Sequence, residues 1–136
     1  MTDTLEWAMG LARRGKWNKV DAAVKRLATD QGFVVRAIRE LLVSDEESIR
    51  DLGATILQRS QILPQDYASE AFAKLYHVVE QHSSTFDGFR AACALVVHNP
   101  YFHTAQVRQT LHNFTADSEV GSIACGYLGR LARIRR

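Results

Sequence analysis

Histidine and cysteine are the residues of this chain whose chemistry could hold a metal ion or supply a nucleophile. His77 and His82 are five residues apart, which places them about 140° apart around a helix rather than on one face. His98 and His103 flank a turn, but a metal site needs further ligands that the sequence does not place beside them. The spacing therefore predicts no metal site.

The two cysteines, Cys93 and Cys125, lie within apolar helical patterns. We expect both to be buried, reduced and unreactive, rather than joined in a disulfide or activated by a histidine. The chain also lacks a glycine-rich phosphate loop, a nucleophile elbow and paired carboxylates beyond ordinary helix caps. We therefore expect no catalytic residue and no cofactor. An enzyme that modifies nucleic acids is the distant alternative.

Arg50 and Arg90 each follow a large apolar residue in a helical pattern. Guanidinium groups bind carboxylates and phosphates, so one interpretation is contact with an acidic partner. In the binding interpretation the two arginines belong to an interrupted basic stripe whose other members are Lys25, Arg59, Arg130 and Arg133.

A second basic cluster mixes cations with a tryptophan near the N-terminus. Such mixtures bind nucleic acid, because cations neutralise phosphates and an aromatic ring can stack on a base. The structural alternative is that the tryptophan packs against Leu11 and Val20 and closes a helical hairpin. The cluster consists of Arg13, Arg14, Lys16, Trp17 and Lys19.

The net charge is only +2, but the charges are unevenly distributed. Residues 1–27 carry six basic and three acidic side chains, residues 28–89 carry five and ten, and residues 90–136 carry six and two. We therefore expect basic ends and an acidic middle rather than one continuous nucleic-acid groove.

The elements that position these residues are predicted to be helices throughout. A large apolar residue is followed by a small one four positions on and a large one eight positions on, which marks one helical face with small residues where another helix approaches. We expect Trp7 in the core, a C-terminal cap at Gly15 and at Gly32, and close packing at Gly53, Gly121 and Gly126. The residues expected between packed helices are Ile49, Leu52, Ile56, Phe89, Cys93, Val97, Val120, Ala124 and Leu128.

Helix caps divide the chain into eight expected helices that pair as four antiparallel hairpins. Capping patterns begin at Ser44, Ser84, Asp117 and the Asn99–Pro100 pair. The sequence thus predicts an all-α fold in one domain, residues 1–136. The expected helices are 3–14, 17–29, 33–43, 45–60, 64–82, 85–98, 100–114 and 118–134.

The segments 45–53, 87–93 and 117–129 resemble the second helix of HEAT repeats. In that family the helix opens with an aspartate in the turn, followed by a Val-Arg pair, a small residue and a Leu-Gly pair. The resemblance implies an α-solenoid, a HEAT-like superhelix of stacked hairpins, whose members mainly serve as protein-binding scaffolds and in a minority bind nucleic acid. It also implies the structural alternative for Arg50 and Arg90, which we favour: each arginine pairs with the aspartate of a turn in a ladder between neighbouring repeats, with Asp45 and Asp87 as the candidate partners.

The function we expect is protein–protein interaction through the concave surface of such a solenoid, with an unidentified protein as partner. The alternative is a nucleic-acid-binding accessory protein that uses the basic segments 13–26 and 130–136. No apolar run approaches the ~18 residues of a membrane span, and the N-terminus lacks the pattern of a signal peptide. We expect a cytoplasmic protein that is a monomer or a weak homo-oligomer.

Overall fold

The computed structural model describes residues 4–61, 63–99 and 104–134. Throughout these residues the secondary structure is helical, with no strand, so the all-α prediction is confirmed. No helix among them is long and apolar enough to cross a membrane. The elements are α1 (Thr4–Arg13), α2 (Trp17–Leu27), α3 (Gln31–Arg36), a π-helical segment (Ala37–Leu41), α4 (Glu47–Arg59), a 3-10 turn (Gln65–Tyr67), α5 (Ala68–Gln81), α6 (Phe86–His98), α7 (Ala105–His112) and α8 (Gly121–Ile134).

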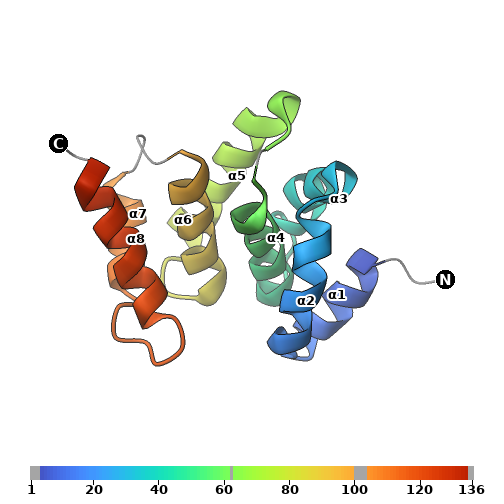
Figure 1. Ribbon diagram of the computed structural model, residues 1–136, viewed down its shortest axis with the longest axis horizontal. Coiled ribbons are helices and arrows are strands. Elements are labelled where there is room, and N and C mark those ends of the chain that lie inside the picture. The colour runs from blue at the N-terminus through green and yellow to red at the C-terminus, as the bar shows by residue number, and fades with distance from the viewer. Residues whose placement is uncertain (1–3, 62, 100–103, 135–136) are drawn as a thin grey trace.

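The helices follow one another along the long axis of the molecule, and the two ends of the chain lie at opposite ends of it (Figure 1). Consecutive helices pack together: α1 with α2, the π-helical segment with α4, α5 with α6, and α7 with α8. The even-numbered helices also contact one another in the order α2, α4, α6, α8, and the contact between α4 and α6 is the most extensive. The side chains of these four helices are therefore presented along one row.

Two glycines near the first turns behave differently from each other. Gly15 has a φ of +73° and ends α1, and the amide of Lys16 donates to the carbonyl of Leu11 at 2.9 Å, as in a left-handed cap. Gly32 was expected to cap a helix in the same way, and this is wrong. It lies inside α3, where its amide donates to the Asp30 carboxylate at 2.9 Å. Asp30 starts a helix there, because its side chain satisfies amides of the first turn.

The last two helices begin at residues whose turns are held by side-chain hydrogen bonds. Helix α7 begins at Ala105, where the Thr104 hydroxyl accepts the amide of Val107 at 3.2 Å. The predicted start at residue 100 lies outside the described residues. Helix α8 begins at Gly121 rather than at residue 118, because the Asp117 carboxylate holds the preceding amides in a turn.

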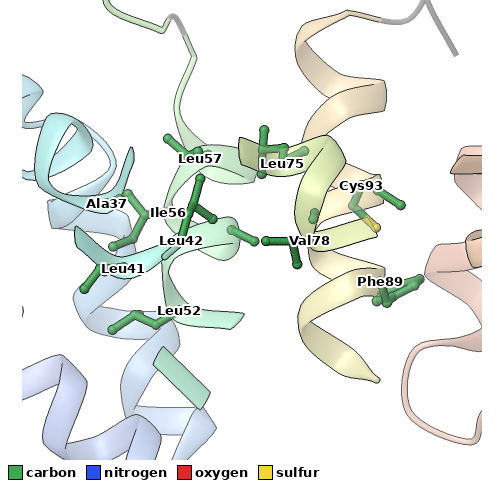
Figure 2. Packing of buried hydrophobic residues seen from close by; sticks show 14 of the residues in the cluster. Ala37, Leu41, Leu42, Leu52, Ile56, Leu57, Leu75, Val78, Phe89 and Cys93 are labelled. Atoms are coloured by element: carbon green, nitrogen blue, oxygen red, sulfur yellow. The ribbon is translucent and has the colours of Figure 1, made fainter. Parts of the chain in front are cut away.

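The core is one hydrophobic cluster that extends from Leu5 in α1 to Leu131 in α8. Figure 2 shows part of it, between Ala37 and Cys93. Gly53 lies in it as predicted, because a Cβ at this position would come 2.8 Å from the Cβ of Leu41. Gly121 is likewise packed, against the carbonyl of Thr115. Gly126 is not, since a Cβ there would meet nothing within 4 Å. The residues predicted to be buried are buried except for two that are partly exposed, Val97 and Leu128.

Two further burial predictions are wrong. Trp7 is 47% exposed, because the buried face of α1 runs from Leu5 through Ala8 to Leu11, and position 7 lies about 40° beyond Leu11, outside that face. Cys125 is exposed beside the buried Ala124, whereas Cys93 is buried as expected. Both errors fall at the ends of the molecule, where only one face of a helix has a neighbour to pack against.

Candidate functional site

All six cations predicted to bind a partner lie on the even-numbered helices. Lys25 is on α2, Arg50 and Arg59 are on α4, Arg90 is on α6, and Arg130 and Arg133 are on α8. Their surroundings differ: some of these cations pair with carboxylates between helices, and others face an open groove.

Arg50 is held between α4 and α6. Its Nε donates to Oδ2 of Asp87 at 2.8 Å and its Nη1 donates to the carbonyl of Ser44 at 2.9 Å. The side chain of Arg50 is only 12% exposed and that of Asp87 is fully buried. This is the ladder contact that the sequence favoured, and it leaves Arg50 little surface for a partner.

Arg90 makes the reciprocal contact from α6 to α4. Its Nε lies 3.6 Å from Oδ1 of Asp51. The sequence suggested Asp45 or Asp87 as the partner of Arg90, and this is wrong. Asp45 is exposed in the turn before α4, and Arg90 lies about one helical turn beyond Asp87, which brings it level with Asp51. The two helices thus exchange one arginine and one aspartate each.

Asp51 is the carboxyl group with the most unusual environment among the described residues. Burial raises its pKa from 3.8 to about 7, an effect that the nearby carboxylates reinforce and that Arg90 and the Thr55 hydroxyl oppose. A carboxyl group with such a pKa could exchange protons near neutral pH. However, the Cys93 thiol nearby is buried, which raises its pKa to about 12 and removes it as a nucleophile. We therefore assign Asp51 and Arg90 a role in the packing of α4 against α6.

Tyr127 on α8 was not identified from the sequence, yet it links the last hairpin to the middle of the row. Its hydroxyl accepts the Nε2 amide hydrogen of Gln58 on α4 at 2.9 Å, although the two residues are 69 positions apart. Burial of the ring raises the pKa of the hydroxyl group. This contact fixes the ring beside Arg130, whose guanidinium carbon lies 5.0 Å from the ring centroid.

Arg130 and Arg133 line a groove of about 310 Å³ together with Ile123, Gly126 and Tyr127, which we call the α8 groove. Within the part of the chain that the structure describes, neither arginine has a carboxylate within ion-pair distance, and both are exposed. The last residues of the predicted basic tail, 135 and 136, lie outside that part.

The remaining two cations of the row, Arg59 on α4 and Lys25 on α2, are exposed. Arg59 lies 3.8 Å from the Asp21 carboxylate, and both side chains are well exposed. Lys25 is exposed on α2 next to them. An exposed pair of this kind contributes little to stability and is screened by salt, so these residues do not form a rigid site.

The N-terminal cluster is only partly available to a ligand. Arg13 donates to the Glu46 carboxylate at 2.7 Å, and Arg14 donates to the carbonyl of Gly10 in its own helix. Trp17 is half-buried and packs against the core, as the structural alternative required. Lys16 and Lys19 are exposed. The structure therefore does not gather the five residues into one open patch.

A larger groove, of about 490 Å³, lies between the end of the π-helical segment and α5. Lys74 in its wall donates to the carbonyl of Ile38 and pairs with Glu70. His77 and His82 also line it. No group of three or more potential metal ligands among His, Cys, Asp and Glu is found in the described residues. His98 instead contacts the carbonyl of Leu57 at 2.6 Å, and burial lowers the pKa of its imidazole.

Comparisons with protein-family models, with curated proteins and with solved structures gave no match. The resemblance to HEAT repeats therefore rests on the sequence motifs alone.

Proposed function

We propose that this protein is a small HEAT-like α-solenoid that binds another protein through the row of even-numbered helices. Support for the solenoid comes from the pairing of consecutive helices and from the successive contacts of α2, α4, α6 and α8. In a solenoid such a row lines one extended surface, which is the part that commonly binds partners. We further propose that the protein acts in the cytoplasm as a monomer or a weak homo-oligomer.

The observation that carries the binding role is the α8 groove. Arg50 and Arg90 are engaged by carboxylates within the fold, whereas Arg130 and Arg133 are exposed and Tyr127 is fixed between them and α4. Arginine and tyrosine are the residue types that most often dominate binding energy at protein interfaces. Binding is favoured over catalysis because the reactive groups with shifted pKa values, Asp51 and Cys93, are buried.

Nucleic-acid binding is the alternative, and it would use the two basic ends of the chain. These ends lie at opposite ends of the molecule (Figure 1). The Arg13 and Arg14 side chains are already engaged. The Asp21 carboxylate lies within the N-terminal basic segment, and that of Glu47 lies on α4 between the two ends. A continuous phosphate backbone needs an uninterrupted basic surface, so the geometry supports a protein partner better.

The test is affinity capture from a lysate of the source cells, with and without nuclease, using the wild type and two matched variants. Arg130→Gln/Arg133→Gln removes two exposed cations from α8, and Lys19→Gln/Arg26→Gln removes two exposed cations from α2. We expect a protein that is retained after nuclease treatment, is lost on the α8 variant and is kept on the α2 variant. Loss of all captured protein after nuclease treatment would instead establish the nucleic-acid alternative.

A further inference from the structure

We propose that the α8 groove binds an acidic segment of the partner protein, with a carboxylate between Arg130 and Arg133 and an apolar side chain over Tyr127 and Gly126. This inference rests on the proposed protein-binding function and specifies the chemistry of the partner.

The charge of this end of the molecule is one-sided. The sequence from residue 120 to residue 136 contains four arginines and no acidic residue. The nearest preceding carboxylates are those of Asp117, which holds the turn before α8, and Glu119, which precedes the helix. The positive charge of Arg130 and Arg133 is thus not neutralised by the helix that carries it, and it complements a carboxylate-rich segment.

Arg130 is held in place by contacts within the fold. Gln58 fixes the hydroxyl of Tyr127 at 2.9 Å, and the guanidinium of Arg130 lies over the Tyr127 ring. Arg133 folds back along α8, with Nη1 3.8 Å from the position that a Cβ at Gly129 would take. Both side chains line the α8 groove, with the guanidinium of Arg130 toward Tyr127 and that of Arg133 toward Gly129. Side chains already held in place lose less entropy when they bind a carboxylate.

The shape of the groove comes from a glycine that the fold does not require. Glycine inside a helix destabilises it by about 1 kcal/mol relative to alanine, and Gly53 and Gly121 have close internal neighbours that account for this cost. Gly126 has open space beside it, and the exposed Ile123 lies one turn before it. A partner chain can approach the helix closely at this point, with an apolar side chain between Ile123 and the Tyr127 ring.

A short acidic peptide fits these features better than a nucleic acid. The groove is about 310 Å³ and holds two arginines. Beyond it, the next cation along the row is Arg90, which already faces Asp51, and Arg59 faces Asp21. A polyanion that continued along the row would meet carboxylates, whereas a protein segment can place its acidic residues over α8 alone.

The experiment is selection of a library of short random peptides on the immobilised wild type, on Arg130→Gln/Arg133→Gln and on Lys19→Gln/Arg26→Gln. We expect peptides with Asp or Glu beside an apolar residue to be enriched on the wild type and on the α2 variant, and not on the α8 variant. Equal melting temperatures of the three proteins exclude unfolding as the cause. Absence of acidic residues from the enriched peptides, or equal enrichment on all three proteins, overturns the proposal.

A binding titration then measures the most enriched peptide as a labelled probe, beside the same peptide with its carboxylates changed to amides and beside a single-stranded oligonucleotide. Loss of the carboxylates, or of both arginines, should weaken binding by about tenfold or more. Tighter binding of the oligonucleotide than of the acidic peptide overturns the proposal in favour of a nucleic-acid partner. If nuclease-resistant protein capture still depends on α8 while acidic peptides fail to bind, this inference is wrong and the proposed protein-binding function stands.

Discussion

Replacing Arg50 by methionine should strongly destabilise the fold, because it leaves the fully buried Asp87 carboxylate without its cation. The lost contact is 2.8 Å long, and the Arg50 side chain is only 12% exposed. Breaking a buried ion pair by removing one partner costs about 3–5 kcal/mol. For a chain of this length, that free energy corresponds to a fall in melting temperature of about 10–15 °C.

Arg13→Met is the matched control for this prediction. Arg13 contacts Glu46 at 2.7 Å, with the same atom type donating, but both side chains are about half exposed, at 50% and 51%. Exposed pairs contribute below about 1 kcal/mol, so the melting temperature should hardly change. Urea unfolding followed by circular dichroism gives both free energies.

A third variant separates loss of the pair from loss of the arginine side chain. Arg50→Met/Asp87→Asn removes the buried carboxylate as well and should recover part of the stability, because most of the cost comes from the unpaired charge. Equal losses for Arg50→Met and Arg13→Met, or no recovery in the double variant, would refute the assignment of Arg50 to the ladder.

Three further predictions concern buried groups. Because the pKa of Asp51 is raised from 3.8 to about 7 in the folded protein, the folded state binds a proton that the unfolded state has released. The contribution of the protonated Asp51 carboxyl group to the free energy of unfolding is complete below pH 3.8 and is lost as the pH rises to about 7. In urea titrations, the free energy of unfolding of the wild type should fall by up to about 4 kcal/mol across this window relative to that of Asp51→Asn. Phe89→Ala should lower the free energy of unfolding by about 3–5 kcal/mol, since Phe89 is fully buried with its ring centroid 4.9 Å from that of Phe114; an unchanged urea midpoint would contradict its place in the core. A thiol reagent should label one cysteine in the native protein and both in urea, because Cys125 is exposed and Cys93 is buried; rapid labelling of two native thiols would be inconsistent with this packing.

The sequence predicted the parts of the fold that depend on local patterns. Small residues at fixed helical spacing identified the close packing at Gly53, and a glycine after an apolar helix identified the cap at Gly15. It did not predict that a Cβ at Gly88 would collide with the carbonyl of His82, because this contact depends on the path of the turn before α6. Trp7 was misplaced because its four-residue spacing from Leu11 places it at the edge of the buried face, and the sequence does not show how far that face extends.

The sequence predicted only part of the candidate site, because contacts between helices depend on how the helices pack and not on local patterns. Equivalent positions in two repeats pointed to Arg50 and its contact with Asp87. Asp51 was missed because the sequence alone does not give the offset between two packed helices, and a shift of one turn changes the partner of Arg90. The contact between Gln58 and Tyr127 bridges α4 and α8 across 69 positions, so no local pattern could reveal it.

Hydroxyl-radical footprinting of the protein with its captured partner tests the central claim most directly, because aromatic reporters lie near both candidate surfaces. Tyr127 lines the α8 groove with the exposed Ile123, while Trp7 is 47% exposed on α1 at the other end of the molecule. We predict that the partner protects Tyr127 and Ile123 from oxidation and leaves Trp7 unchanged. Protection of Trp7 and Trp17 with unchanged oxidation of Tyr127 would contradict the account and move the binding site to the N-terminal hairpin.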